Sequence, residues 1–201
     1  MSAEAIKPSA TLTIGAIVAA AVIALAALSA LLAVVAAQGA CSGAGLEARP
    51  SSEAKRGIPP SYLTLYQQAG RAYSLPWPVL AAIGSIETDH GRSRAPVVRA
   101  GVNRRGCCAG PMQFNLRDGP PSTWERYGTD ANHDGTRNVY DRGDAIPSAA
   151  NYLRALLGRA GGNLSQAVLG YNHSQAYVRA VLARARAYAR QTEGELNRPS
   201  Q

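Results

Sequence analysis

Glu87 is the residue of this chain best suited by its position to act as a general acid. It continues an apolar stripe formed by Leu80 and Ile83, at positions i, i+3 and i+7 of a predicted helix. A carboxyl group among apolar side chains loses hydration of its charged form, which raises its pKa toward the range of a general acid. Cleavage of a glycosidic bond needs such an acid to protonate the leaving oxygen. The alternative is a helix-end carboxylate paired with Arg92 or Arg94, and spacing alone leaves it open.

Oxygen-bearing side chains between residues 130 and 138 follow the pattern that opens an EF-hand calcium loop. The candidate ligands at loop positions 1, 3, 5 and 7 are Asp130, Asn132, Asp134 and Thr136. Gly135 stands at position 6, where the loop turns sharply, and position 12 is Asp141 instead of the usual glutamate. The pattern predicts one weakly bound, structural calcium ion, with an ordinary polar turn as the alternative.

The three cysteines form neither a disulfide framework nor a metal-ligand set, because their number is odd and Cys107 and Cys108 are adjacent. Adjacent cysteines bond to each other only through a strained ring. Pairing of one of them with Cys41 or with another chain is the alternative, and the sequence leaves it open.

Helices must position these residues, since apolar residues recur at three- and four-residue spacing and no run alternates over strand length. The predicted helices cover residues 62–73, 78–89, 145–157, 164–171 and 174–190. Residues 91–122 are predicted to be loop around a short segment at 112–114. The class is therefore all-α, with room for a small hairpin in the middle. The globular domain is expected at residues 58–190, after a linker at 42–57 and before a loose tail at 191–201.

Three segments resemble motifs of the lytic transglycosylases in the lysozyme-like superfamily. Residues 81–91, with Glu87, resemble the segment that carries that family's catalytic glutamate. Gly110-Pro111-Met112-Gln113-Phe114 is similar to its second motif, and Tyr171-Asn172, followed by Tyr177-Val178, to its third. The motifs occur in family order across about residues 58–190. The resemblance implies a lysozyme-like helical domain and a lytic transglycosylase activity.

The resemblance also implies roles for single residues. Glu87 would protonate the oxygen that links N-acetylmuramic acid to N-acetylglucosamine, and would then take the proton of the muramic 6-hydroxyl, giving a 1,6-anhydro end. The residues expected to line the cleft and hold the sugar are Met112, Gln113, Tyr171, Asn172 and Tyr177. Core packing is the alternative for the tyrosines. Asp89 lies at i+2 from Glu87, roughly on the opposite side of the helix, so a second catalytic carboxylate is not expected.

The calcium pattern makes the membrane-bound type B transglycosylases the most similar group. They resemble this chain in the Asp-Ala-Ile that opens the next helix, as in Asp144-Ala145-Ile146. This suggests a longer loop closed by Asp144, with closure by Asp141 as the alternative. No organic cofactor is implied.

The N-terminal segment is predicted to be a single transmembrane anchor. No charged residue lies between Lys7 and Glu47, and residues 10–37 are almost wholly Ala, Val, Leu and Ile. A helix needs roughly 20 apolar residues to cross the bilayer core, so residues 1–9 would form a cytoplasmic stub. A cleaved signal peptide and a lipoprotein cysteine at Cys41 are the alternatives. All three place the remaining chain outside the cytoplasm.

The basic residues that follow this segment, Arg49, Lys55 and Arg56, outnumber Lys7 before it. The positive-inside rule taken alone would therefore favour a cytoplasmic C-terminus. An external glycan substrate requires the opposite orientation, and we expect the catalytic domain to be extracytoplasmic.

The formal net charge is +8, but the arginines are scattered and form no basic helix or aromatic-basic patch. Nucleic acid is therefore not an expected partner. The expected partners are the peptidoglycan strand, the membrane, and a cell-wall or secretion complex. Two alternative functions remain: a hydrolytic muramidase that uses Glu87 with water, and a non-catalytic cell-wall-binding assembly protein.

Overall fold

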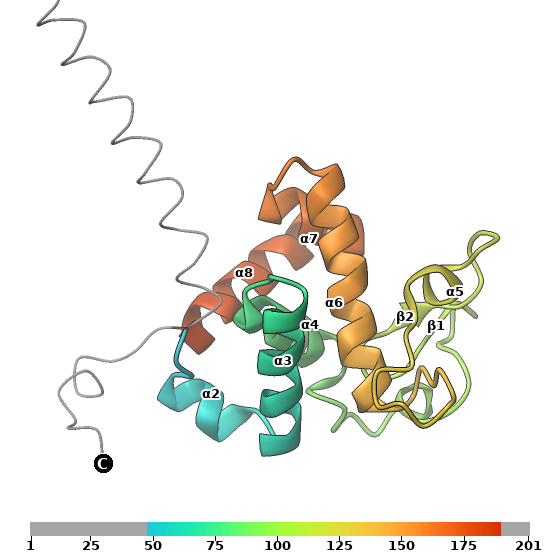
Figure 1. The fold of residues 1–201 in the computed structure, drawn as a ribbon, viewed down its shortest axis with the longest axis horizontal. Coiled ribbons are helices and arrows are strands. Elements are labelled where there is room, and N and C mark those ends of the chain that lie inside the picture. Colours follow the sequence, from blue (N-terminus) through green and yellow to red (C-terminus); the bar gives the residue numbers. More distant parts are fainter. Residues whose placement is uncertain (1–47, 190–201) are drawn as a thin grey trace, which may run out of the picture. The chain divides into compact units, whose positions relative to one another are not determined.

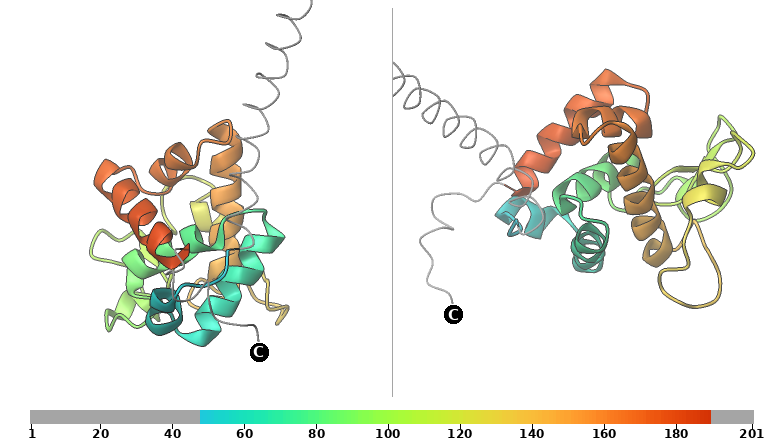
Figure 2. Two further views of the ribbon diagram at one scale, coloured as in Figure 1. Left: turned by 90° about the vertical axis from the view of Figure 1, so that its left-hand side faces the viewer. Right: turned by 45° about the horizontal axis from the view of Figure 1, so that its top comes forward.

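Helices make up most of the fold of residues 48–189, which are the residues that the computed structural model describes. The α-helices are α2 (Ser52–Gly57), α3 (Pro60–Ala72), α4 (Trp77–Thr88), α5 (Thr123–Tyr127), α6 (Arg142–Arg159), α7 (Leu164–Tyr171) and α8 (Gln175–Ala189). A 3-10 helix, η1 (Pro96–Val98), and two strands, β1 (Cys108–Ala109) and β2 (Phe114–Asn115), lie between α4 and α5 in the sequence. The strands pair as an antiparallel hairpin, which lies with α5 on one side of α6 (Figure 1; Figure 2, right).

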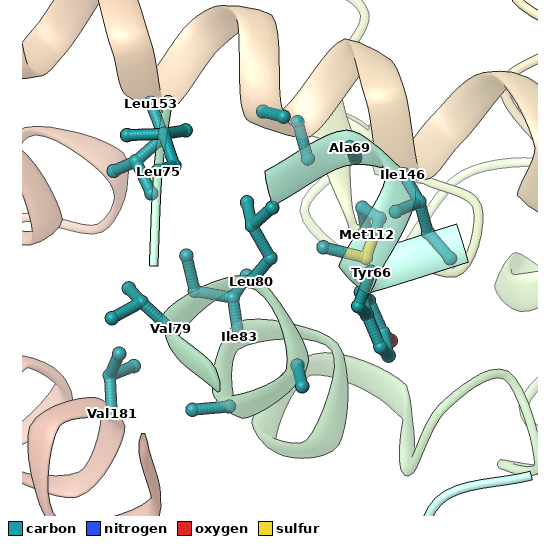
Figure 3. Packing of buried hydrophobic residues seen from close by; sticks show 14 of the residues in the cluster. Tyr66, Ala69, Leu75, Val79, Leu80, Ile83, Met112, Ile146, Leu153 and Val181 are labelled. Atoms are coloured by element: carbon teal, nitrogen blue, oxygen red, sulfur yellow. The ribbon is translucent and has the colours of Figure 1, made fainter. Parts of the chain in front are cut away.

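Helix α4 forms the centre of the apolar core. Its residues 77–84 are all buried, and it packs against both α3 and α8. Figure 3 shows Leu80 and Ile83 within a cluster that also holds Tyr66 of α3 and Val181 of α8. A helix that is apolar on every face is stable only when it is surrounded by other elements. The C-terminal turn of α4, which carries Glu87, is therefore held from several sides.

The hairpin turn brings the Gly-Pro-Met-Gln segment against the core. Gly110 has φ +77, and a Cβ atom there would lie 2.0 Å from the carbonyl oxygen of Val139. Only glycine fits this backbone and this close approach. Met112, two residues later, is fully buried, and Gln113 has a positive φ of 50°.

The domain begins earlier than we expected from the sequence. Residues 52–57, predicted to be linker, form α2, in which Ala54 is fully buried and the Ser51 side chain caps the first turn. The Ser51 amide also donates to the Tyr188 carbonyl at 3.0 Å, so this segment is joined to α8. The sequence pattern missed α2 because six residues are too few to show an apolar period.

The five longer helices were predicted within a few residues of their bounds, and the small hairpin is present. The prediction missed η1, inside the segment expected to be loop, and α5, directly after that segment. Within residues 48–189 no helix is both long and apolar enough to cross a membrane. The predicted stub, anchor and tail, at residues 1–9, 10–37 and 191–201, lie outside the described residues, as does Cys41.

Candidate active site

Glu87 lies in the last turn of α4 and is half-buried. Its Oε1 accepts a 2.6 Å hydrogen bond from the hydroxyl of Tyr177 on α8. Burial raises the pKa of the Glu87 carboxyl group, and the Tyr177 hydrogen bond opposes this rise. A carboxyl group that keeps its proton toward higher pH is suited to donate it to a leaving oxygen.

The ion-pair alternative for Glu87 is not what the structure shows. Arg92 pairs with Asp89 through a 2.6 Å contact, and no ion pair of Glu87 is present among residues 48–189. This pairing lowers the pKa of the largely exposed Asp89 carboxyl group. Asp89 does not line the cavity beside Glu87, so the two carboxyl groups do not form a catalytic pair.

Glu87 lines a cavity of about 460 Å³. Three of the predicted sugar-binding residues, Gln113, Tyr171 and Asn172, line this cavity with it. They come from the turn before β2, from the end of α7 and from the residue that follows α7. The cavity therefore joins segments that lie far apart in the sequence, as the order of the three motifs led us to expect.

Tyr177 and Met112 have different places from those we predicted. Tyr177 is buried against Glu87 and does not line the cavity, so it contacts the acid instead of forming the wall. Burial and the neighbouring Glu87 raise the pKa of its hydroxyl, which stays a hydrogen-bond donor. Met112 has no exposed surface, and its carbonyl accepts a 2.9 Å hydrogen bond from the Tyr171 hydroxyl. Met112 thus supports the wall from behind.

Gln113 is held in place by its own turn. Its side-chain amide donates to the Gly110 carbonyl at 2.8 Å, and its backbone amide donates to the same oxygen at 3.2 Å. The side-chain carbonyl of Gln113 is not used in this contact. An amide group positioned in this way suits the N-acetyl and hydroxyl groups of an amino sugar.

Several lining residues were not predicted from the sequence. They are Asn103, Arg105, Cys107, Cys108, Phe114, Asn115, Asp118, Thr123, Tyr152, Gly170 and His173. A usable signal existed for Phe114, which belongs to the second motif, and for Asn115 and His173, which directly follow the second and third motifs. The others come from β1 and the loops around the hairpin, or from α5, α6 and α7, and no local pattern marks them.

Cys107 and Cys108 form a disulfide with each other. The sequence left open whether one of them paired with Cys41 or with another chain. Cys107 is buried and Cys108 half-buried, and both face the cavity that holds Glu87.

The candidate calcium loop folds into nested turns held by its own side chains. Asp130 accepts from the amides of Asp134 and Gly135 at 3.1 and 2.9 Å, and Asp134 accepts from Thr136 at 2.9 Å. Asn132 accepts from the Asp134 amide at 3.0 Å. Among residues 48–189 no group of three Asp, Glu, His or Cys side chains is arranged to hold a metal ion.

Asp144 joins this loop to α6. It is fully buried, and its two oxygens accept from the amides of Ala131, Asn132 and Asn138 at 2.9, 3.3 and 2.9 Å. Asp141 instead accepts from Gly143 and caps α6. Of these two residues, the one that is hydrogen-bonded to the loop amides is therefore Asp144. The oxygens suit calcium in type. Oδ1 of Asp144 already accepts two hydrogen bonds, and among residues 48–189 the carboxylates are not grouped around a metal position.

A predominantly helical, lysozyme-like fold with a half-buried carboxyl group beside its cavity is typical of enzymes that cleave glycans. Residues 64–193 match the transglycosylase SLT domain family, and the chain belongs to that family. It is a peptidoglycan lytic transglycosylase, an enzyme that breaks glycosidic bonds as a lyase. No match is found among curated proteins.

Solved structures of two such enzymes are similar to this chain. The Escherichia coli lytic transglycosylase SLT35 in complex with bulgecin A is 19% identical, with a TM-score of 0.48, over 67% of this chain and 76% of that one. SltB3 from Pseudomonas aeruginosa in complex with NAG-anhNAM-pentapeptide is 17% identical, with a TM-score of 0.49, over 67% and 65%. Another SLT35 structure, in complex with calcium, is 17% identical, with a TM-score of 0.48, over 67% and 76%.

Proposed function

We propose that Glu87 is the acid and base of a transglycosylation that leaves a 1,6-anhydro-muramic end. The observation that carries this proposal is that the Glu87 carboxyl group lies half-buried beside the cavity and accepts a hydrogen bond from Tyr177 through Oε1. Because Oε1 accepts from Tyr177, the proton of the neutral acid belongs on Oε2. That oxygen is then the donor to the substrate.

The reaction has two halves. In the first, Glu87 gives its proton to the oxygen that leaves on N-acetylglucosamine while the bond to C1 of N-acetylmuramic acid breaks. The N-acetyl group of the muramic sugar stabilises the positive charge at C1. In the second, the C6 oxygen bonds to C1, and its proton returns to the Glu87 carboxylate. Gln113 and Asn172 would hold amide and hydroxyl groups of the sugar, and Tyr171 would contact a ring face.

A comparison of Glu87→Gln with wild type tests this assignment. We expect glycan cleavage to fall about a hundred-fold to ten-thousand-fold, the range contributed by a general acid. Glu53→Gln is the matched control, because Glu53 is exposed and pairs with Arg184 at 3.3 Å on α8. Lysis by Glu87→Gln at the wild-type rate would favour a non-catalytic wall-binding protein.

The product distinguishes this proposal from hydrolysis. One observation favours hydrolysis as the second candidate: Asp118 also lines the cavity, and hydrogen bonds from Asn115 and Arg117 lower its pKa. Such a carboxylate could activate water. Mass spectrometry of digested peptidoglycan separates the two reactions. Anhydro ends would support transglycosylation, whereas reducing ends would show that the enzyme is a hydrolytic muramidase.

We also propose that the enzyme is a single-pass membrane protein of the type B group, with residues 10–37 as its anchor and an extracytoplasmic catalytic domain. The proposal rests on the uncharged apolar run and on a substrate outside the cytoplasm. Fractionation and protease digestion of intact spheroplasts test it. Retention in the membrane after alkaline washing, with the domain accessible to protease, is expected. Release by washing, or a protected domain, would contradict it.

Residues 130–144 are proposed to bind one calcium ion weakly, with Asp130, Asn132, Asp134, Thr136 and Asp144 as the ligand set. The nested turns keep three of these side chains on one short loop, and Asp144 reaches it from α6. Calcium at about 100 times its dissociation constant would add about 2.7 kcal/mol of stability. We expect calcium to raise the melting temperature and chelation to reverse this, with no shift in Asp130→Asn. Identical melting temperatures in all conditions would disprove the site.

A further inference from the structure

The Cys107–Cys108 disulfide occupies part of the wall of the catalytic cavity. Both cysteines line that cavity together with Glu87, and Cys108 is the more exposed of the two. The pair stands at the start of β1, across the hairpin from Asn115, which also lines the cavity. The disulfide is thus placed where a bound glycan would pass.

This disulfide does not serve the stability of the fold in the usual way. A disulfide stabilises a protein mainly by restricting the unfolded chain, and the effect grows with the length of the loop that it closes. Cys107 and Cys108 are one residue apart, so their bond closes no loop of chain. What the disulfide contributes must therefore lie in the surface that the bonded pair presents to the cavity.

Hydrogen bonds already hold the turn that leads to the pair. The Asn103 side chain accepts from the amides of Arg105 and Cys107 at 3.1 and 3.3 Å. Its backbone amide donates to the Cys108 carbonyl at 2.9 Å, and its carbonyl accepts from Gly106 at 2.7 Å. Leu116 donates to the Cys107 carbonyl at 2.7 Å. The turn is therefore fixed independently of the bond between the sulfur atoms.

We propose that the Cys107–Cys108 disulfide is a substrate-contacting element, which presents an apolar, polarizable surface to one sugar ring of the glycan. The proposal rests on the function proposed above and names a further part of the same binding site. Two bonded sulfur atoms carry no hydrogen-bond donor, whereas two thiols carry two weak donors. The oxidised pair therefore suits the C–H face of a sugar ring better than the reduced pair does.

The surroundings of the disulfide fit an amino sugar with an acidic substituent. Asn103 and Arg105, from the same turn, also line the cavity. An amide suits an N-acetyl group, and a guanidinium suits a carboxylate, such as that of a muramic lactyl group or stem peptide. Aromatic rings of Tyr152 and Tyr171, whose centroids are 5.3 Å apart, supply further ring-contacting surface.

The test separates binding from chemistry. In the full chain with Cys41→Ser, the pair supplies the only cysteines. The ligand is a soluble tetrasaccharide of alternating N-acetylglucosamine and N-acetylmuramic acid, and its dissociation constant is measured in the Glu87→Gln background. Three forms of this protein are compared: the oxidised protein, the protein reduced with a phosphine, and the double variant Cys107→Ser with Cys108→Ser. We expect the reduced protein and the double variant to bind the tetrasaccharide about five-fold more weakly than the oxidised protein does. Phosphine should have no effect on the double variant.

Controls keep the outcomes distinct. Arg104→Ala changes an exposed neighbour outside the cavity wall and should leave the dissociation constant unchanged. In the active enzyme, loss of the disulfide should raise KM and leave kcat within about two-fold. Equal affinity of the oxidised and reduced proteins, with equal melting temperatures, would overturn the proposal. If the oxidised enzyme binds the glycan but never cleaves it, the proposed function fails and this inference stands.

Discussion

The hydroxyl of Tyr177 on α8 lies 2.6 Å from Oε1 of Glu87 on α4 and donates a hydrogen bond to it, across 90 positions of sequence. α4 and α8 pack against each other, and both contribute residues to the close-packed core. The hydrogen bond acts against burial in setting the pKa of Glu87. The pKa of Glu87 on α4 therefore depends also on a residue of α8.

Removal of the Tyr177 hydroxyl should move the pH profile of the enzyme. In Tyr177→Phe the burial of Glu87 remains and the opposing hydrogen bond is lost, so the pKa of Glu87 rises further. The alkaline limb of kcat/KM, where Glu87 loses its proton, should therefore shift to higher pH, while kcat falls about ten-fold. Tyr73→Phe, at the residue that follows α3, is the control. An alkaline limb at the same pH in both variants would show that Tyr177 does not tune the acid.

A second carboxyl group near Glu87 should be dispensable. Asp89 is exposed and paired with Arg92, and it lies outside the cavity wall. Asp89→Asn keeps a residue type that tolerates the left-handed backbone found there, φ 52°. We expect activity within about two-fold of wild type, and a stability loss of at most about 1 kcal/mol, as for other exposed ion pairs. A fall as large as that of Glu87→Gln would require a two-carboxylate mechanism.

Substitution of the hairpin glycine, Gly110, should destabilise the protein, whereas substitution of a helix glycine should not. Gly110→Ala introduces a Cβ atom against the Val139 carbonyl at positive φ, and we expect a loss of about 2–4 kcal/mol in the free energy of unfolding. In α6, Gly158 has open space around it, so Gly158→Ala should stabilise by about 0.5–1 kcal/mol. Urea unfolding of both variants measures the difference. Similar values would mean that the turn relaxes around the new side chain.

A buried histidine should make stability depend on pH. His90 lies between the hydroxyls of Tyr66 and Tyr188, at 3.2 and 3.1 Å, and burial lowers its pKa from 6.5 to about 4. The unfolded chain therefore binds a proton below pH 6.5 that the folded protein resists until about pH 4. By linkage, the free energy of unfolding should be highest above pH 6.5 and fall as the pH falls toward 4.

The variant His90→Gln keeps a polar group between the tyrosines but removes this titration. Its stability should be lower at neutral pH and flatter between pH 6.5 and 4 than that of wild type. His133→Gln, at an exposed position, should keep the wild-type slope. An unchanged slope in His90→Gln would assign the pH dependence to other groups.

Asp144 should matter to stability even without calcium. It is fully buried and accepts three backbone hydrogen bonds from the loop. Asp144→Ala leaves these amides without their partner, at an expected cost of about 2–4 kcal/mol in chelator. Asp134→Ala, in the exposed part of the loop, should cost less than about 1 kcal/mol. Chemical unfolding in chelator measures both, and equal effects would show that Asp144 does not anchor the loop.

Much of the fold could be read from local pattern. The apolar spacing around Leu80 and Ile83 predicts α4 and places Glu87 at its end, because a helix period is a property of neighbouring residues. The same holds for the longer helices α3, α6, α7 and α8. Short elements such as α2 and α5 show no period, and their formation depends on capping, as by Ser122 and Glu125 in α5, and on packing.

The sequence by itself determined the helical class, the order of the motifs and the place of Glu87 at the end of a helix, since residue type and spacing suffice for these. Only the tertiary structure decided which side chains share the cavity. It placed Tyr177 on the acid and Met112 behind the wall, joined Cys107 to Cys108 inside the cleft, and bound Asp144 to the loop amides. These outcomes depend on distances between segments far apart in the chain, which packing of the whole core sets and no local pattern encodes.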